Sequence, residues 1–225
     1  MEQFQETLQI LAIMGVVLAL PLIWVIAYVF TASQKYKRLE DLMKETAAVV
    51  GLQYKDHCLF GEEDGVRFQI GLQALRTSSE PRGRYVVRAQ VPGQLPRGFL
   101  AQPSKWTPWL DKWADKQLNP GHFTSGHEVL DKAYCFDSDD RRTSIQLLAD
   151  PEVQQALISL LRPPGAGWVV DDDVYIAFEE GDMYPRVLQN PENVRYCIDT
   201  VVKAALVLER AHSRIRHQAQ VTLAS

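Results

Sequence analysis

The N-terminal part of the chain contains an uninterrupted hydrophobic segment. Residues Ile10 to Phe30 make a run of 21 positions without a charged side chain. A helix of that length spans roughly 30 Å, the thickness of the hydrocarbon core of a bilayer. A helix also satisfies its own backbone hydrogen bonds, which lipid cannot do for it. The pattern therefore predicts a transmembrane helix over residues 10–30.

The charges beside this run predict its direction in the membrane. Lys35, Lys37 and Arg38 follow the run closely, and no Lys or Arg precedes it. The positive-inside rule then places the C-terminal side in the cytoplasm and residues 1–9 outside. A cleaved signal peptide would need basic residues before a shorter run. We expect a single-pass protein of a bacterial inner membrane.

A second helix is expected directly after the membrane segment. The apolar positions of residues 31–51 indicate a juxtamembrane helix that ends at Gly51, a residue that commonly stops helices. No Gly, Pro or Ser-rich linker separates this stretch from the membrane segment. The soluble domain is therefore expected to lie close to the membrane surface.

Strict alternation of apolar and polar residues predicts strands in the next part of the chain. Residues 66–72 and 85–91 alternate with a period of two, which is typical of strands with one buried and one solvated face. Shorter segments complete a prediction of about six antiparallel strands, with acidic turns at 61–65 and 171–173 that we expect to be solvated. The shorter segments are residues 52–60, 129–136, 168–170 and 174–178. Residues 92–128 are expected to be largely irregular.

Two further helices are predicted by the same local pattern. Asp150-Pro151-Glu152 and Asn190-Pro191-Glu192 each combine a capping side chain, a proline in the first turn and an acid. The second helix is the longest of the soluble part and ends near His217, leaving a tail over residues 218–225. Its expected apolar stripe is Val194, Ile198, Val201, Ala205 and Leu208. The sum is an α+β domain over residues 52–217, with the sheet packed against the long C-terminal helix and one or two shorter helices.

The net charge bears on the class of partner, and the cysteine content bears on the compartment. The net charge is −4, and because Glu2 and Glu6 precede all 24 basic residues, the chain after the hydrophobic run carries 24 − 26 = −2. A domain whose net charge is so close to zero has no extended positive potential that would attract nucleic acid. Cys58, Cys135 and Cys197 are too few and too odd in number for a disulfide framework, which fits a reducing compartment.

Several polar groups resemble metal sites but lack the required spacing. His127-Glu128-Val129-Leu130-Asp131 is similar to the zinc-protease string, yet we expect it at the entrance of a strand, where positions i and i+4 lie about 13 Å apart. His122, Cys135 and Asp137 could join His127 in a mixed site, without a recognised ligand spacing. We expect no metal or cofactor.

Two more local combinations have ordinary explanations. Asp137, Asp139 and Asp140 begin like a calcium loop, but the glycine that such a loop requires at its sixth position is absent. One of these aspartates is expected to cap the following helix. His57 and Cys58 are adjacent on an expected strand and would point to opposite faces, so they are not expected to act as a catalytic pair.

Three tryptophans form a stripe at helical spacing. Trp106, Trp109 and Trp113 are surrounded by lysines, as in helices that lie in a membrane interface. Such stripes are most often buried in a core, so contact with lipid or with a partner is the alternative.

No catalytic motif with a reliable spacing is present. We therefore expect a non-enzymatic interaction or assembly module, bound to the bilayer through residues 10–30, with a protein partner or a homo-oligomer. The alternative is a membrane-associated enzyme whose site is assembled from distant residues, with His122, His127, Glu128 and Asp137 as candidates.

Overall fold

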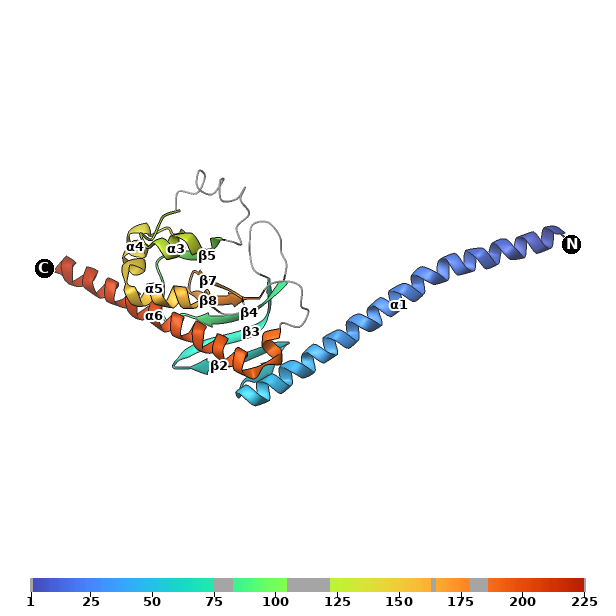
Figure 1. Cartoon of the computed structure of the whole chain (residues 1–225), viewed down its shortest axis with the longest axis horizontal. Helices are drawn as coiled ribbons and strands as arrows, with labels where there is room; N and C mark the ends of the chain where they lie inside the picture. Colours follow the sequence, from blue (N-terminus) through green and yellow to red (C-terminus); the bar gives the residue numbers. More distant parts are fainter. Residues whose placement is uncertain (1, 75–82, 105–121, 163–164, 179–185, 225) are drawn as a thin grey trace. The chain divides into compact units, whose positions relative to one another are not determined.

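The computed structural model describes residues 2–74, 83–104, 122–162, 165–178 and 186–224 (Figure 1). The side chains of residues 2–23 and of a few residues beside the gaps are outside this description. The chain divides into two units, Met1–Leu42 and Met43–Ser225, which are described separately.

The first unit lies within one long helix. Helix α1 covers Glu2–Val50 without interruption, and it ends where Gly51 adopts a φ of 77°. The predicted helix before Gly51 is therefore present, and no break separates it from the hydrophobic segment. Within the part of the chain whose side chains are described, no helix is both long and apolar enough to cross a membrane. Residues 10–23 of the expected membrane segment lie outside that part.

The second unit contains one antiparallel sheet of eight strands. The strands, in chain order, are β1 (Gln53–Lys55), β2 (Cys58–Glu63), β3 (Val66–Ala74), β4 (Gly83–Gln90), β5 (Leu100–Pro103), β6 (Tyr134–Asp137), β7 (Ala166–Val170) and β8 (Asp173–Ala177). Their order in the sheet is β1-β2-β3-β4-β8-β7-β5-β6. The α+β class and the antiparallel sheet are confirmed, whereas the expected number of six strands is too small.

The two additional strands have local causes. The expected first strand is split into β1 and β2 by a turn at Asp56 and His57, both with positive φ. The next turn is tighter than expected, because β2 continues to Glu63 and only Asp64 and Gly65 connect it to β3. Strand β5 lies in the stretch expected to be irregular. Its sequence, Leu-Ala-Gln-Pro, does not alternate between apolar and polar residues, and β6 and β7 supply its pairing.

The expected strand over residues 129–136 is partly wrong. Helix α3 covers Glu128–Ala133, and only the residues after it form β6. The carboxylate of Asp131 accepts hydrogen bonds from the backbone N–H and the hydroxyl of Ser125, both at 2.7 Å, and from the N–H of Gly126 at 3.2 Å. These bonds stabilise the start of a helix too short for its apolar period to be visible.

Two of the remaining helices begin at the predicted capping residues, and a third begins at one of the three candidate aspartates. Asp140 caps α4 (Arg141–Ala149), and Asp150 caps α5 (Pro151–Ser159). Asn190 accepts from the N–H of Glu192 at 2.9 Å at the start of α6 (Pro191–Ala224), after a short 3-10 helix, η2 (Arg186–Gln189). Helix α6 continues through the residues expected to form an unpatterned tail, since Gln218 to Ala224 include no Gly or Pro to end it.

The core lies between one face of the sheet and helices α4, α5 and α6. All five residues of the predicted α6 stripe are almost completely buried, and α6 packs against β3, β4 and β8. Gly167 of β7 allows a close approach of Leu160, whose carbonyl oxygen would lie 2.5 Å from a Cβ at this position. The opposite face of the sheet, which we call the second face, carries the alternate residues of each strand.

Candidate functional site

Polar and aromatic side chains form a continuous row across the second face of the sheet. The strand register places Gln69 beside Arg88, and Arg88 beside Tyr175. The row extends to Phe60 on one side and to Trp168 on the other. Each member comes from a different strand, so the row exists only in the folded sheet.

Arg88 and Asp173 form a bidentate ion pair on this face. The Arg88 guanidinium donates to both carboxylate oxygens of Asp173, at 2.8 and 2.7 Å, and the Tyr175 hydroxyl donates to the same carboxylate at 3.2 Å. The guanidinium also lies 5.8 Å from the centre of the Tyr175 ring. The bonds to Asp173 raise the pKa of Arg88 above its usual value, although partial burial acts in the opposite direction.

Two of the three aspartates in the turn before β8 are bound to other parts of the domain. The Asp172 carboxylate accepts from the N–H of Leu95 at 2.7 Å, and the Asp172 carbonyl accepts from the N–H of Val91 at 2.8 Å. Asp173 is occupied by Arg88, and only Asp171, with a φ of 52°, is exposed. The expectation of a solvated turn is therefore wrong for two of its three aspartates.

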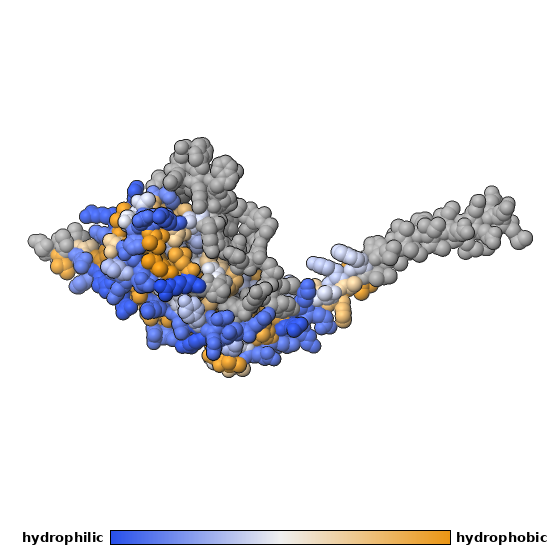
Figure 2. Space-filling view, viewed as in Figure 1, coloured by the Kyte–Doolittle hydropathy of each residue, from blue (hydrophilic) through white to orange (hydrophobic). Residues whose placement is uncertain are grey.

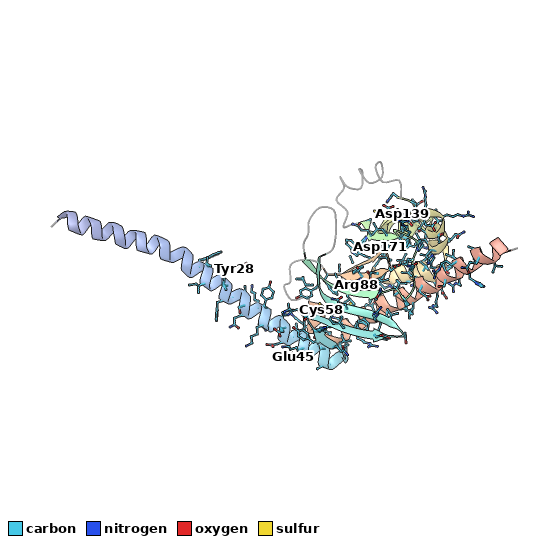
Figure 3. The ribbon with its side chains drawn as sticks, turned by 180° about the vertical axis from the view of Figure 1, so that it is seen from behind. Tyr28, Glu45, Cys58, Arg88, Asp139 and Asp171 are labelled. Carbon is cyan, nitrogen blue, oxygen red and sulfur yellow. The ribbon has the colours of Figure 1, made fainter. Side chains whose placement is uncertain are left out.

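A pocket of about 180 Å³ opens beside this contact, over strands β2, β3 and β4. Figure 3 labels Arg88 and Cys58 among the side chains of the sheet. The pocket combines two guanidinium groups, two amides and aromatic carbon. Its lining residues are Phe60, Arg67, Phe68, Gln69, Arg88 and Gln90. Such a set can bind an anionic or planar polar group, and it offers no nucleophile activated by a base.

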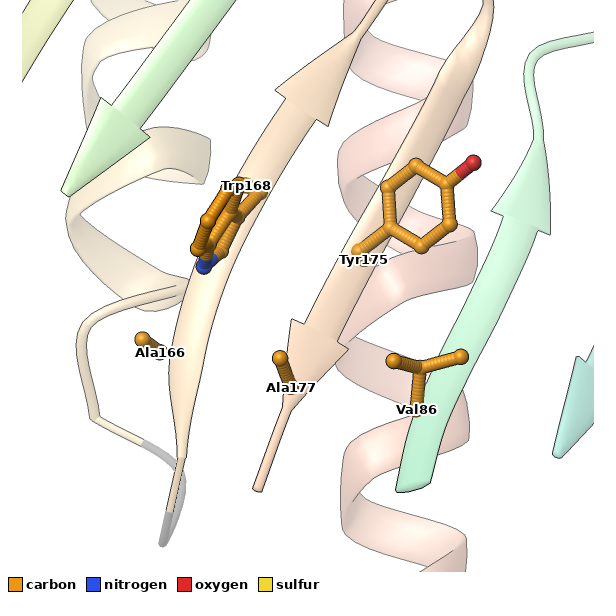
Figure 4. Close-up of a cluster of buried hydrophobic side chains, with 5 residues drawn as sticks. All are labelled: Val86, Ala166, Trp168, Tyr175 and Ala177. Atoms are coloured by element: carbon orange, nitrogen blue, oxygen red, sulfur yellow. The ribbon is translucent and has the colours of Figure 1, made fainter. Parts of the chain in front are cut away.

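The second face also contains a buried apolar cluster. Trp168 and Tyr175 lie beside three small side chains, Val86, Ala166 and Ala177, and all five are at least nine-tenths buried (Figure 4). The alternation in residues 85–91 had assigned Val86 to the solvated face. The sheet therefore buries apolar area on both faces, and polar groups are concentrated over β2, β3 and β4.

Some of the histidines and acids considered for catalysis or metal binding already have other partners. His127 precedes α3, and Glu128 forms a salt bridge with Lys132 at 2.6 Å. His122 lies before the isolated bridge of Phe123, and Asp137 ends β6. His127 and Asp131 are in fact one helical turn apart, but the Asp131 carboxylate is already occupied by Ser125 and Gly126.

Among the described residues, no group of three or more His, Cys, Asp or Glu is arranged to hold a metal ion. Asp140 accepts from the N–H of Thr143 at 3.1 Å, as expected for a capping residue, and Asp139 lies 3.6 Å from Arg97.

His57 and Cys58 have separate partners. The His57 Nδ1 lies 3.2 Å from the Tyr54 hydroxyl, whereas the Cys58 sulfur accepts from the amide of Gln69 at 3.1 Å. Cys58 packs so closely over Gly71 that a Cβ there would lie 2.5 Å from the sulfur. The thiol thus contacts Gln69, a member of the row across the second face, and does not pair with the histidine.

Trp106, Trp109 and Trp113 lie outside the described residues, so their burial stays a prediction. The residues that we expect to determine topology, Lys35, Lys37 and Arg38, are all exposed on α1.

The C-terminal part of the hydrophobic segment is exposed in the structure. The large side chains between Trp24 and Phe30 are between 53% and 72% exposed, and the rings of Trp24 and Tyr28 stack at 6.1 Å. Figure 2 shows hydrophobic atoms of this segment on the surface of the helix. Because the exposed residues are consecutive, they cover every side of the helix rather than a single stripe.

No protein-family model matches the chain, and no match is found among curated proteins or solved structures. Sequence reasoning did not identify the pocket. Its only signal was the polar half of two alternating segments, Arg67 and Gln69 in one and Arg88 and Gln90 in the other.

Proposed function

We propose that this chain is a single-pass membrane protein that holds an α+β interaction or assembly domain at the cytoplasmic face of a bacterial inner membrane. The exposed run from Trp24 to Phe30 supports the anchor most directly. Apolar side chains around a whole helix are stable in lipid, whereas each costs on the order of 1.5–3 kcal/mol when exposed to water instead of buried.

Aromatic and basic residues support the proposed direction. Trp24 and Tyr28 are of the type enriched near membrane interfaces, and Lys35, Lys37 and Arg38 follow as the cytoplasmic charges. The helix then continues to Val50, and its last residues belong to the domain, where Met43 and Ala47 are buried. If this helix connects the proposed span to the domain, each residue of the connection adds about 1.5 Å along the helix axis.

The proposed role as an interaction module rests on the composition of the second face. The pocket contains groups that bind, namely guanidinium, amide and aromatic groups, without a catalytic pair. The partner is a protein or a second copy of the chain.

Extraction from membranes tests the anchor. Val17→Arg with Leu20→Arg introduces two charges near the middle of the proposed span, at about 2.5–3.5 kcal/mol each. We expect alkaline carbonate to release this variant but not the wild type. Tyr36→Arg, at an exposed position beyond the proposed span, is the matched control and should stay in the membrane fraction. Release of the wild type would refute the anchor.

Labelling of introduced cysteines tests the direction of the chain across the membrane. Cys58 and Cys135 are first changed to Ser, so that they do not react. In intact cells an impermeant maleimide should label Gln3→Cys, whereas Asp64→Cys should react only after lysis. Changing Lys35, Lys37 and Arg38 together to Glu should weaken or reverse this pattern. Labelling of Asp64→Cys in intact cells would contradict the cytoplasmic domain.

A further inference from the structure

One guanidinium of the pocket has no carboxylate partner among the described residues. Arg67 donates to the side-chain oxygen of Gln90 at 3.3 Å, which uses one of its five N–H groups. Glu62 is opposite Arg67 in the strand register, yet no ion pair within 4 Å joins them. Arg67 therefore presents donors to whatever enters the pocket.

The neighbouring arginine of the pocket, Arg88, already has a carboxylate partner within the chain. Arg88 holds Asp173 through two parallel hydrogen bonds, so the chain itself supplies the carboxylate there. The positive charge of Arg88 is compensated by that pair, and the charge of Arg67 remains. Paired N–H donors of a guanidinium match the two oxygens of a carboxylate, which makes a carboxylate the best-fitting ligand group.

The other lining groups restrict the ligand further. The oxygen of Gln90 is bound to Arg67, so its NH₂ group is available as a second donor near the same point. Phe60 is half-buried beside Gln69 and offers an apolar wall for a short carbon chain. A volume of about 180 Å³ is smaller than the roughly 300–1,000 Å³ of typical small-molecule sites, and suits a single side chain.

We infer that this pocket receives an Asp or Glu side chain of a protein partner, with Arg67 binding the carboxylate and Gln90 assisting. The inference rests on the proposed interaction function and specifies the chemistry of the partner. An unpaired guanidinium, an adjacent amide donor, an aromatic wall and side-chain dimensions occur together on a face formed by three paired strands. A free small carboxylate shares the same chemistry and is distinguished by the test.

Binding to the full chain in mild detergent provides the test. The probes are a terminally blocked hexapeptide Thr-Val-Glu-Val-Thr-Ser, the same peptide with Gln in place of Glu, and glutarate. We expect the Glu peptide to bind at least about tenfold more tightly than either other probe, a difference of about 1.4 kcal/mol. Arg67→Gln should remove this advantage, and Arg67→Lys should recover only part of it, because lysine keeps the charge without the paired donors.

Two further variants control for charge. Arg195→Gln removes an exposed arginine that is paired with Glu63 and Asp199, and should change the affinity less than twofold. Glu62→Gln removes the acid opposite Arg67 and should tighten binding of the Glu peptide about two- to threefold.

Equal binding of the two peptides, or an unchanged affinity in Arg67→Gln, would refute the carboxylate site. Glutarate binding as tightly as the Glu peptide would refute the protein source. The membrane extraction of Arg67→Gln should remain like that of the wild type, so a failure of the site can be distinguished from a failure of the anchor.

Discussion

The contact between Arg88 and Asp173 should stabilise the domain more than a surface ion pair does. We consider the changes Arg88→Met and Asp173→Asn, singly and together. The side chains are 34% and 16% exposed, and two hydrogen bonds of 2.8 and 2.7 Å join them. Exposed pairs contribute roughly 0.2–1 kcal/mol, whereas removal of one partner of a fully buried pair costs about 3–5 kcal/mol.

Coupling energies of contacting residues range over about 0.5–3 kcal/mol, and because both side chains are partly buried we place this one above the exposed pairs, at about 1.5 kcal/mol. Asp173→Asn alone should cost more, about 2 kcal/mol, because it leaves the partly buried charge of Arg88 without its carboxylate and weakens the acceptor of the Tyr175 hydroxyl. Arg88→Met should cost at least as much, because it leaves the carboxylate of Asp173, the more buried of the two groups at 16% exposed, with only the bond from the Tyr175 hydroxyl.

The assay is a double-mutant cycle on the free energy of unfolding, measured by urea titration of the full chain in mild detergent and followed by near-ultraviolet circular dichroism. The pair Glu128–Lys132 is the matched control, at 2.6 Å but with both side chains at least 75% exposed, and should couple by about 0.3–0.5 kcal/mol. A coupling of Arg88 and Asp173 no larger than that of the control would refute the reasoning from burial.

Two further predictions concern buried positions. Gly167→Ala should destabilise the domain by about 2 kcal/mol in the same urea titration, because the new Cβ would lie 2.3 Å from the Cβ of Leu160, and little effect would contradict the close approach. Gly93→Ala, whose Cβ would meet the flexible side chains of Glu209 at 3.3 Å and Arg216 at 3.9 Å, is the control and should change stability by less than about 0.5 kcal/mol. Burial raises the pKa of Cys197 to about 12, so the folded state binds this proton more tightly than the unfolded state, whose thiol has a pKa of about 8.5. The stability from Cys197 is complete below pH 8.5 and is lost as the pH rises toward 12, by about 2 kcal/mol at pH 10, and Cys197→Ala should show a correspondingly flatter alkaline decline.

The sequence was sufficient for elements whose signal is local. Asp150 and Asn190 predicted the starts of α5 and α6, and one of Asp137, Asp139 and Asp140 was expected to cap α4, because a capping side chain bonds to backbone only two or three residues away. The apolar stripe of α6 was equally clear over its several turns. Signals of this kind do not depend on the rest of the fold.

Short elements were not predictable in the same way. Strand β5 reads Leu-Ala-Gln-Pro, which does not alternate between apolar and polar residues, and the six residues of α3 cover less than two helical turns. Strand β5 depends on the strands on either side of it, whereas α3 is supported by a local contact, the hydrogen bonds that Asp131 accepts from Ser125 and Gly126.

The candidate site depends on the strand order, which no local pattern contains. Arg67 and Arg88 were recognisable as residues of a solvated strand face, but the partner of Arg88 is 85 positions later in the chain. Strand β4 pairs with β8 instead of with the next strand, and this pairing places Asp173 beside Arg88. The difference between a compensated and an uncompensated arginine follows from that topology.

Stability alone does not explain the polar character of the second face. Although the pair of Arg88 and Asp173 stabilises the domain once it is present, replacing both members of such a pair with well-packed apolar residues is often neutral or stabilising. The same sheet packs Tyr175 and Trp168 into an apolar cluster a short distance away along the row. An apolar surface over β2, β3 and β4 would bind many partners without selection, whereas an arginine without a carboxylate favours those that supply one. Under the proposed interaction function, Arg67 contributes to binding and not to folding, so its loss should leave the free energy of unfolding nearly unchanged while removing the preference for the Glu peptide.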